Sequence, residues 1–484
     1  MKKYIILLVL VLFLPILFHV FARDASAYAY MGTLLFEGKI PYIDGWDHKG
    51  ISLYFINALG YLIGFKNYVG IRILELILIS YSFLNIYKIF CIQFSKKIAF
   101  IAVSFGLLTL RYFFDGGNLT EEYGAIFVLL SLSLLLKKEH QTLDYLIIGF
   151  LFVINFTIRA NLISFWIAMF FAFILFYFIK KKEFQKLIII FLKIGLGIVI
   201  GCSFLAIYFL ITDSFTDFYN AAFTYNFSYS KQSIGTTISS IIKSTRTYEV
   251  SLIMLLALLI SVVSIIKKRL NFITILLLFW IPIELYFSNM SGRGYPHYFM
   301  MWVPTIVLST AFVVNYFKAE FISKEKRFVV VLITTFLFFQ IPIFNTISAY
   351  KNLLSSKKSN NELIADYVNS TYKSKSILVW GNESTIYNLT DKRAPVTNFY
   401  QTLFKVNSPI TKQMIADFTT QIKINPPEII IDVKTHSLLF LDKSNSSKID
   451  SFQQENLKDF FTFFSNKYQF VETKNGANFY FKKP

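Results

Sequence analysis

The residues best suited to chemistry in this sequence lie close together, directly after the first hydrophobic run. Asp24 follows that run, and the tetrapeptide WDHK at 46–49 lies in the same polar stretch, which covers residues 23–67. Ionisable side chains at the edge of a membrane are costly unless they are paired or functional, so they are candidates for a working site. A carboxylate such as Asp24 can act as a general base toward a hydroxyl group, or can bind a divalent cation.

The tetrapeptide offers a carboxylate, an imidazole and a cation within four positions. Lys49 can bind a phosphate group as a point charge, and Asp47 or His48 can hold a metal ion. The alternatives are structural: Asp24 as a helix cap or as the partner of Arg23, and the tetrapeptide as an interfacial anchor in the aromatic belt. Residue types alone leave both interpretations open.

An acidic loop provides a second group of candidates. Asp115, Glu121 and Glu122 occur in the sequence DGGNLTEE, between two apolar runs. Two carboxylate groups from different loops suit a general base combined with a metal-binding or positioning role. Either glutamate is equally well explained as a negative charge at a helix N-terminus, where the helix dipole favours it.

A third group contains Arg293 and His297, in the sequence SGRGYPHYF. Arginine suits bidentate recognition of phosphate, and histidine can donate to phosphate or bind a metal. A positive charge on the outer side departs from the usual orientation bias, which favours a functional role for Arg293. Arg159 is a further phosphate-binding candidate, but it is more isolated, and a structural ion pair is the favoured interpretation for it.

The composition excludes an ordinary soluble protein. Of 484 residues, 55% are hydrophobic and 18% are aromatic, which is typical of a polytopic membrane protein. The net charge of +19 comes from short Lys and Arg clusters between hydrophobic runs, so it indicates cytoplasmic loops and not a nucleic-acid partner. The two cysteines, Cys91 and Cys202, lie inside apolar runs without the spacing of a disulfide framework or a zinc site.

The apolar runs predict a bundle of transmembrane helices. A span needs roughly 20 apolar residues, and this length gives about eleven spans. With the N-terminus inside, the basic clusters all fall on the cytoplasmic side, and the candidate loops fall on the outer side. The run 51–65 is too short to cross and predicts an interfacial helix. The predicted spans are approximately 3–22, 68–93, 98–114, 123–136, 143–158, 162–179, 187–211, 249–266, 271–288, 298–317 and 328–347.

After the last span the sequence becomes polar for more than a hundred residues, which predicts a small α/β domain outside the membrane. We therefore divide the chain into a transmembrane domain, 1–349, and an extracytoplasmic domain, 350–484. The second lacks GxGxxG and P-loop motifs, so a nucleotide site is not expected. Its predicted elements are helices at 360–372 and 409–424, strands at 376–380 and 428–433, and a closing hairpin at 468–473 and 477–481.

With these groups identified, the sequence resembles the GT-C superfamily of membrane glycosyltransferases that use polyprenyl-phosphate sugars. Protein O-mannosyltransferases and bacterial aminoarabinose transferases belong to that superfamily. The resemblance rests on Asp24, on GKIPY at 38–42, on WDHKG at 46–50, on LTEEYG at 119–124 and on GRGYPHYF at 292–299. It extends over nearly the whole chain. The sequence departs from many relatives in having Ala25 after Asp24 and Gly50 after Lys49.

The resemblance implies a reaction and a set of roles. A sugar would pass from a polyprenyl-phosphate donor, such as an undecaprenyl-phosphate sugar, to a glycan, polymer or lipid acceptor on the outer face, with inversion at the anomeric carbon. The acidic residues Asp24, Asp115, Glu121 and Glu122 would be catalytic. The donor phosphate would contact Lys49, Arg293 and Arg159, and a divalent cation (Mg²⁺, Mn²⁺ or Zn²⁺) would bind Asp47, His48 or His297.

The alternative is a non-enzymatic carrier or flippase for lipid-linked oligosaccharides, or a polymerase-like membrane protein. Transporters usually place ionisable residues near the bilayer midplane, in broken helices. The candidates here gather at one predicted surface, which favours an enzyme. The Lys, Ile, Phe and Asn bias indicates an AT-rich bacterial genome, and by association a cell-wall polysaccharide acceptor.

Overall fold

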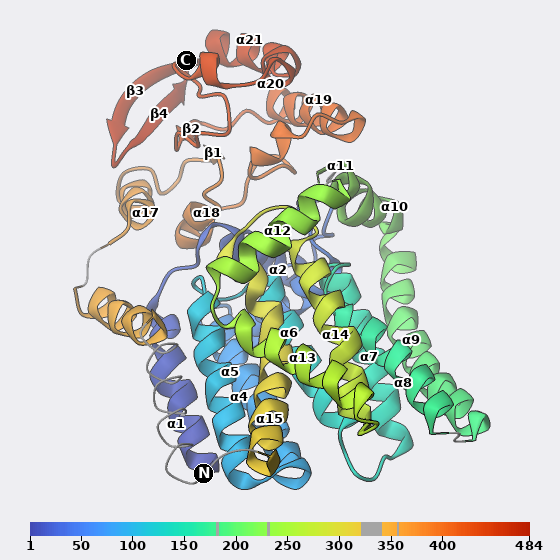
Figure 1. The fold of residues 1–484 in the computed structure, drawn as a ribbon. Helices are drawn as coiled ribbons and strands as arrows, with labels where there is room; N and C mark the ends of the chain where they lie inside the picture. Colours follow the sequence, from blue (N-terminus) through green and yellow to red (C-terminus); the bar gives the residue numbers. More distant parts are fainter. Residues whose placement is uncertain (181–182, 230–232, 321–340, 356–357) are drawn as a thin grey trace. The chain divides into compact units, whose positions relative to one another are not determined.

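The computed structural model describes residues 1–180, 183–229, 233–320, 341–355 and 358–484. The chain forms two compact units, each built from segments that are far apart in the sequence (Figure 1). Unit 1 consists of Met1–His19, Arg72–Tyr208 and Gln232–Leu354. Unit 2 consists of Val20–Ile71, Phe209–Lys231 and Ser355–Pro484. The stretch that contains Asp24 and the WDHK tetrapeptide therefore belongs to the same unit as the C-terminal residues.

Unit 1 is helical in its described part. Its helices pack in pairs, α8 against α14, α5 against α15, and α6 against α7, and α13 contacts both α14 and α15. Most of α4 and α9 also lies in this unit. The elements are α1 Lys2–Phe13, η1 Leu14–Phe18, α4 Val69–Gln93, α5 Lys96–Phe113, α6 Thr120–Leu135, α7 Thr142–Ile158, α8 Ser164–Ile179, α9 Phe184–Thr212, α12 Ile234–Thr247, α13 Ser251–Ile266, α14 Phe272–Asn289, η3 Pro296–Met301 and α15 Trp302–Glu320.

The helices follow the predicted spans closely, but the number of spans stays a prediction. Four helical stretches of the described residues are long and apolar enough to cross a membrane, and six if each bent pair of helices counts as one span. Helices α7 and α8 are apolar but shorter than a full crossing needs. The eleventh predicted span, 328–347, lies largely outside the described residues. The four stretches are Val69–Gln93, Phe184–Thr212, Phe272–Asn289 and Pro296–Lys318.

Unit 2 combines helices with one small sheet. The sheet has the strand order β1-β2-β4-β3, in which β1 and β2 are parallel and the other neighbours are antiparallel (Figure 1). The elements are α2 Arg23–Phe36, α3 Ile51–Ile63, α10 Phe215–Tyr219, the π-helical turn η2 Asn220–Tyr225, α11 Asn226–Tyr229, α17 Asn360–Thr371, β1 Ile377–Trp380, α18 Thr385–Thr390, η4 Thr402–Lys405, α19 Pro409–Ile424, β2 Ile429–Asp432, η5 Ser446–Lys448, α20 Ser451–Asn456, α21 Lys458–Lys467, β3 Tyr468–Lys474 and β4 Ala477–Lys482.

The helices, strands and hairpin predicted for the C-terminal residues are present, and local sequence explains where they begin. Helix α17 begins with a capping box between Ser359 and Glu362, and α19 begins with Ser408 as its N-cap and Pro409 in its first turn. All residues of β1 and β2 are buried, as expected for strands in the middle of a domain. The predicted closing hairpin is formed by β3 and β4.

Helices α2 and α3 pack tightly against each other and frame the WDHK tetrapeptide. Gly32 makes this contact possible, because a Cβ atom at that position would lie 2.4 Å from Cβ of Asn57. Helix α3 begins immediately after Gly50, as predicted for an interfacial helix. The pair therefore fixes both ends of the polar stretch that contains the first candidates.

Candidate active site

Asp24 lies in the first turn of α2, which follows the extended residue Ala22. Its side chain is exposed and makes no hydrogen bond or ion pair with any residue in the described part of the chain. The neighbouring Arg23 bonds instead to Glu383, with 2.7 Å between Nε and Oε1. The structural alternative of an Arg23–Asp24 pair is therefore not formed, and the carboxylate of Asp24 is available to solvent.

Asp47 is a buried anion at the centre of the first cluster. Its side chain is 1% exposed and accepts hydrogen bonds from the Tyr54 hydroxyl at 2.9 Å, the Tyr400 hydroxyl at 2.5 Å and the His48 backbone N–H at 2.8 Å. Burial opposes the charge, but the side chains of His48 and Lys49 outweigh it and hold the pKa of Asp47 well below its usual range. The carboxylate is thus ionised and saturated by donors.

His48 connects this anion to Lys49. Nζ of Lys49 lies 2.7 Å from Nε2 of His48, and Nδ1 of His48 lies 3.2 Å from Oδ1 of Asp47. Burial, and then the charge of Lys49, lower the pKa of His48, so the ring is neutral and its Nε2 accepts from the ammonium group. The charge of Asp24 acts on the same ring in the opposite direction. Asp24 is therefore within electrostatic range of the His48–Lys49 pair.

Aromatic residues of the 209–231 segment cover His48. The ring of Tyr225 lies 5.1 Å from Trp46 and 5.5 Å from His48, and Tyr229 lies 5.8 Å from His48. Asn226 donates to the carbonyl oxygen of His48 at 2.8 Å. The cluster is consequently assembled from the polar stretch, from this aromatic segment and, through Tyr400, from the C-terminal part of unit 2.

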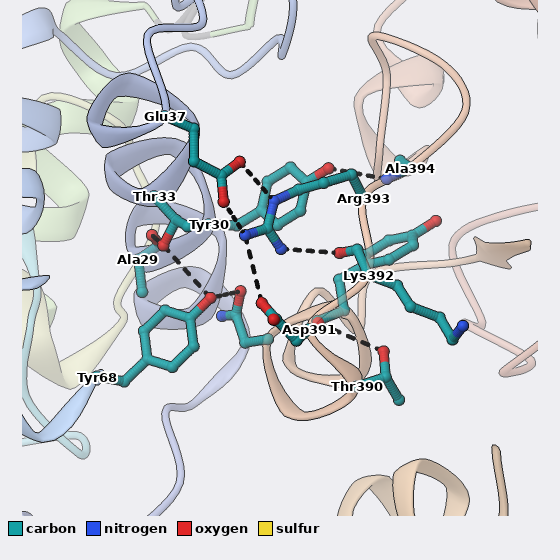
Figure 2. Close-up of polar contacts among 12 residues, drawn as sticks. Ala29, Tyr30, Thr33, Glu37, Tyr68, Thr390, Asp391, Lys392, Arg393 and Ala394 are labelled. Atoms are coloured by element: carbon teal, nitrogen blue, oxygen red, sulfur yellow. Dashed lines mark hydrogen bonds and ion pairs between the residues drawn. The ribbon is translucent and has the colours of Figure 1, made fainter. Parts of the chain in front are cut away.

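Helix α2, which presents Asp24, is fixed by the C-terminal part of the same unit. Figure 2 shows Arg393 beside Glu37, with 2.9 Å between Nε and Oε2. The Arg393 guanidinium also lies over the Tyr30 ring, 5.9 Å from its centroid, and the backbone N–H of Ala394 donates to the Tyr30 hydroxyl at 2.9 Å. These contacts anchor the helix through Tyr30 in its middle and through Glu37, the residue that follows its last turn.

Unit 1 gathers most of the remaining candidates. Nδ1 of His297 lies 3.6 Å from Oδ2 of Asp115, and this neighbour lowers the pKa of the Asp115 carboxyl group. Glu121 pairs with Arg159, whose guanidinium lies 4.6 Å from the centroid of the Tyr298 ring. The acidic loop and the Arg/His loop are thereby brought together, as α6 contacts η3. The structural ion pair expected for Arg159 is present.

The other two candidates of unit 1 are Arg293 and Glu122. Arg293 is half-buried in the loop between α14 and η3. Glu122 is fully buried and lies beside Glu75, which pairs with Arg72 at 3.1 Å. Glu121 and Glu122 therefore have different surroundings although they are adjacent in sequence.

Sequence reasoning missed several residues of these clusters. Arg72 and Glu75 interrupt an apolar run at a spacing of three. Charged residues inside a predicted span are rare, and this pattern could have marked both as candidates. Tyr400 and Lys405 had no such signal, because their relation to the WDHK tetrapeptide depends on the tertiary fold. Nζ of Lys405 lies 5.8 Å from the centroid of the Tyr229 ring, next to His48.

The donor atoms around His48 suit an anion better than a metal cation. The described residues contain no group of three or more His, Cys, Asp or Glu side chains placed to hold a metal ion. The oxygens of Asp47 already accept hydrogen bonds, and Nε2 of His48 faces the ammonium group of Lys49. A divalent cation at Asp47 and His48 would have to displace these donors and approach a positive charge.

The fold is shared with two solved membrane proteins. ArnT from Cupriavidus metallidurans, solved in the apo state and bound to undecaprenyl phosphate, matches with a TM-score of 0.64 at 10% identity, over 99% of this chain and 97% of ArnT. The oligosaccharyltransferase of Archaeoglobus fulgidus, solved in complex with Zn and sulfate, matches with a TM-score of 0.53 at 12% identity, over 99% of this chain and 73% of that one. No protein-family model and no curated protein sequence matches the chain.

Both neighbours belong to the GT-C superfamily, so this chain has the fold of GT-C membrane proteins. The resemblance drawn from the sequence is confirmed at this level. With its apolar helices, the fold defines a multi-pass membrane protein.

Proposed function

We propose that this protein is a glycosyltransferase that moves a sugar from a polyprenyl-phosphate donor to an acceptor hydroxyl group. The GT-C fold supports this reaction class. The observation that carries the proposal is the arrangement around His48: the ammonium group of Lys49 is held at 2.7 Å by a neutral imidazole, and Asp24 lies within electrostatic range. A positive group and a solvent-exposed carboxylate in one cluster match the needs of a phosphate leaving group and a nucleophilic hydroxyl.

In the proposed step, the acceptor oxygen attacks the anomeric carbon while Asp24 takes its proton. A new carbon–oxygen bond forms, and the bond between that carbon and the phosphate oxygen breaks. The electron pair of this bond leaves with polyprenyl phosphate, and Lys49 stabilises the charge that develops on it. Attack opposite to the leaving group inverts the anomeric centre. The products are the glycosylated acceptor, polyprenyl phosphate and a proton on Asp24.

Asp47 acts through His48 in this scheme and is a positioning residue. Its buried charge and its three hydrogen bonds fix the loop, and the imidazole between Asp47 and Lys49 orients the ammonium group. The ammonium group of Lys49 is a positive charge that a phosphate oxygen could contact.

The other predicted roles remain part of the proposal. We assign catalytic or positioning roles to Asp115 and Glu121, phosphate contacts to Arg293 and Arg159, and a divalent-cation ligand role to His297. The acceptor is proposed to be a cell-surface glycan, polymer or lipid of a bacterium, cell-wall polysaccharide among them. The N-terminus would lie in the cytoplasm, and the residues after 350 would form an extracytoplasmic domain.

A transfer assay with purified protein tests the proposal. Polyprenyl-phosphate sugars are offered together with cell-surface polymers, and the product is followed by mass spectrometry. We expect transfer by the wild type and none by Asp24→Asn, because the amide removes basicity with little change in volume. Asp44→Asn is the matched control, since Asp44 is exposed in the same stretch and bonds to the backbone of Ile40.

Near-normal turnover by Asp24→Asn would contradict the base assignment. If the wild type moves intact lipid-linked oligosaccharide across the membrane of proteoliposomes without forming a new glycosidic bond, the protein is a carrier and the proposed reaction is wrong.

A further inference from the structure

A buried charged cluster lies behind the acidic loop of unit 1. Arg72 and Glu75 are 2% and 0% exposed, and Nη1 of Arg72 donates to Oε2 of Glu75 at 3.1 Å. Glu122 is also 0% exposed. Neither oxygen of Glu122 accepts a well-aligned hydrogen bond from a donor among the described residues, and the carboxyl group of Glu75 and the backbone N–H of Leu119 are among its polar neighbours.

Two ionised carboxylates cannot bond to each other, because neither has a donor. If both were charged, the cluster would hold two negative charges against the single positive charge of Arg72, out of contact with water. A buried charge without a partner is strongly destabilising, whereas a shared proton removes the excess charge and makes the missing hydrogen bond. The nearby Tyr123 cannot supply it, since its hydroxyl donates to Oδ1 of Asn118.

We propose that Glu122 carries a proton and donates it in a hydrogen bond to Glu75, so that Arg72, Glu75 and Glu122 form a neutral cluster. Glu122 is then a positioning residue and not one of the catalytic carboxylates. The cluster acts on the arrangement of the acidic loop, and its relevance to catalysis rests on the proposed function.

The cluster holds the turn between Asp115 and Glu121. Oε1 of Glu75 accepts the backbone N–H of Asn118 at 3.1 Å. Gly117 has a φ of +79°, and a Cβ atom there would lie 2.1 Å from Oε1 of Glu75. The turn therefore closes directly onto this carboxylate, and only glycine fits at its tip. The charge state of Glu75 and Glu122 thus sets the position of the loop that presents Asp115 and Glu121.

Infrared spectroscopy of the full-length protein in detergent tests this assignment. A protonated carboxyl group has a carbonyl stretch that ionised carboxylates lack. We expect one such band at neutral pH in the wild type that is lost in Glu122→Gln, measured in the difference spectrum of variant and wild type, in which the bands of other buried carboxyl groups cancel. The matched control is Glu121→Gln, because Glu121 pairs with Arg159 and not with Glu75, so its removal should leave the band unchanged.

Stability provides a second readout. The side-chain amide that Glu122→Gln introduces can donate to Glu75 as the protonated acid does, so this variant should unfold at the wild-type temperature. Glu75→Gln should unfold at a lower temperature, because it leaves Arg72 without its counter-charge. The proposal is overturned if Glu122→Gln keeps the band, or if it destabilises the protein as much as Glu75→Gln. These outcomes do not depend on whether the wild type transfers sugar, so they are separate from a failure of the proposed function.

Discussion

The hydroxyl group of Tyr400 lies 2.5 Å from Oδ1 of Asp47, although 353 residues separate them in the chain. This bond joins the C-terminal part of unit 2 to the WDHK tetrapeptide. A backbone hydrogen bond joins the same two segments, since the N–H of Trp46 donates to the carbonyl oxygen of Thr397 at 3.0 Å. The C-terminal residues therefore contribute directly to the candidate site.

We expect Tyr400→Phe to lower both the stability of the folded protein and the rate of sugar transfer. The change deletes one donor to a buried charge, and a hydrogen bond to a charged group contributes about 1.5–3 kcal/mol. Thermal unfolding in detergent and the transfer assay measure the two effects. Tyr372→Phe is the control: Tyr372 donates to Glu472 at 3.0 Å, away from the cluster, and its loss should leave transfer unchanged. Equal effects of the two changes would contradict the link to Asp47.

Lys49→Ala should mainly impair use of the donor. Removal of a charged contact worth about 1.5–3 kcal/mol raises the half-saturating donor concentration roughly tenfold to a hundredfold. Lys39→Ala removes an exposed lysine from the same polar stretch and is the control. The half-saturating donor concentration is obtained by measuring the initial rate at increasing donor concentration. A Lys49→Ala curve that coincides with that of the control excludes Lys49 as a phosphate contact.

We expect the stability of the C-terminal sheet to depend on pH through Asp432. It is 0% exposed and accepts the backbone N–H groups of Lys434 and Leu441, both at 2.8 Å. Burial raises its pKa from 3.8 to about 6. Between these values the folded protein binds more protons than the unfolded chain, so the contribution of Asp432 to stability is fully present below about pH 4 and is lost as the pH rises through 6. The total loss is about 3 kcal/mol.

Asp432→Asn should flatten this dependence, even though it also loses one backbone bond. Hydrogen–deuterium exchange of the 434–441 loop, compared between variant and wild type at each pH, measures the slope directly. Asp417→Asn, at an exposed position on α19, is the control. Parallel curves for Asp432→Asn and the wild type would show that another group titrates.

Labelling from outside the cell tests the predicted topology. Cys91 and Cys202 are first replaced by serine, and single cysteines are introduced at the exposed positions Ser447 and Lys138. The basic loops predict a cytoplasmic N-terminus, so Ser447→Cys should react with an impermeant thiol reagent and Lys138→Cys only after the membrane is opened. Protection of Ser447→Cys in intact cells would place the C-terminal residues inside and would remove the basis for a cell-surface acceptor.

The sequence alone predicted the class of protein and most of its local structure. Apolar runs, caps and turn residues act over a few positions, which is why α3, α17, α19 and the β3–β4 hairpin appear where the sequence places them. The same local information selected Asp24 and Lys49 as candidates, because charged residues beside an apolar run are conspicuous in a sequence.

Only the tertiary structure decided which of these residues meet. The bond between Tyr400 and Asp47 and the pairing of Arg23 with Glu383 join residues more than 350 positions apart, and no local pattern encodes such contacts. The tertiary structure also gives the two adjacent glutamates different partners: Glu121 pairs with Arg159, and Glu122 lies beside Glu75. Adjacent residues of a helix point in directions about 100° apart, so their different partners follow from the packing of α6 and not from their shared residue type.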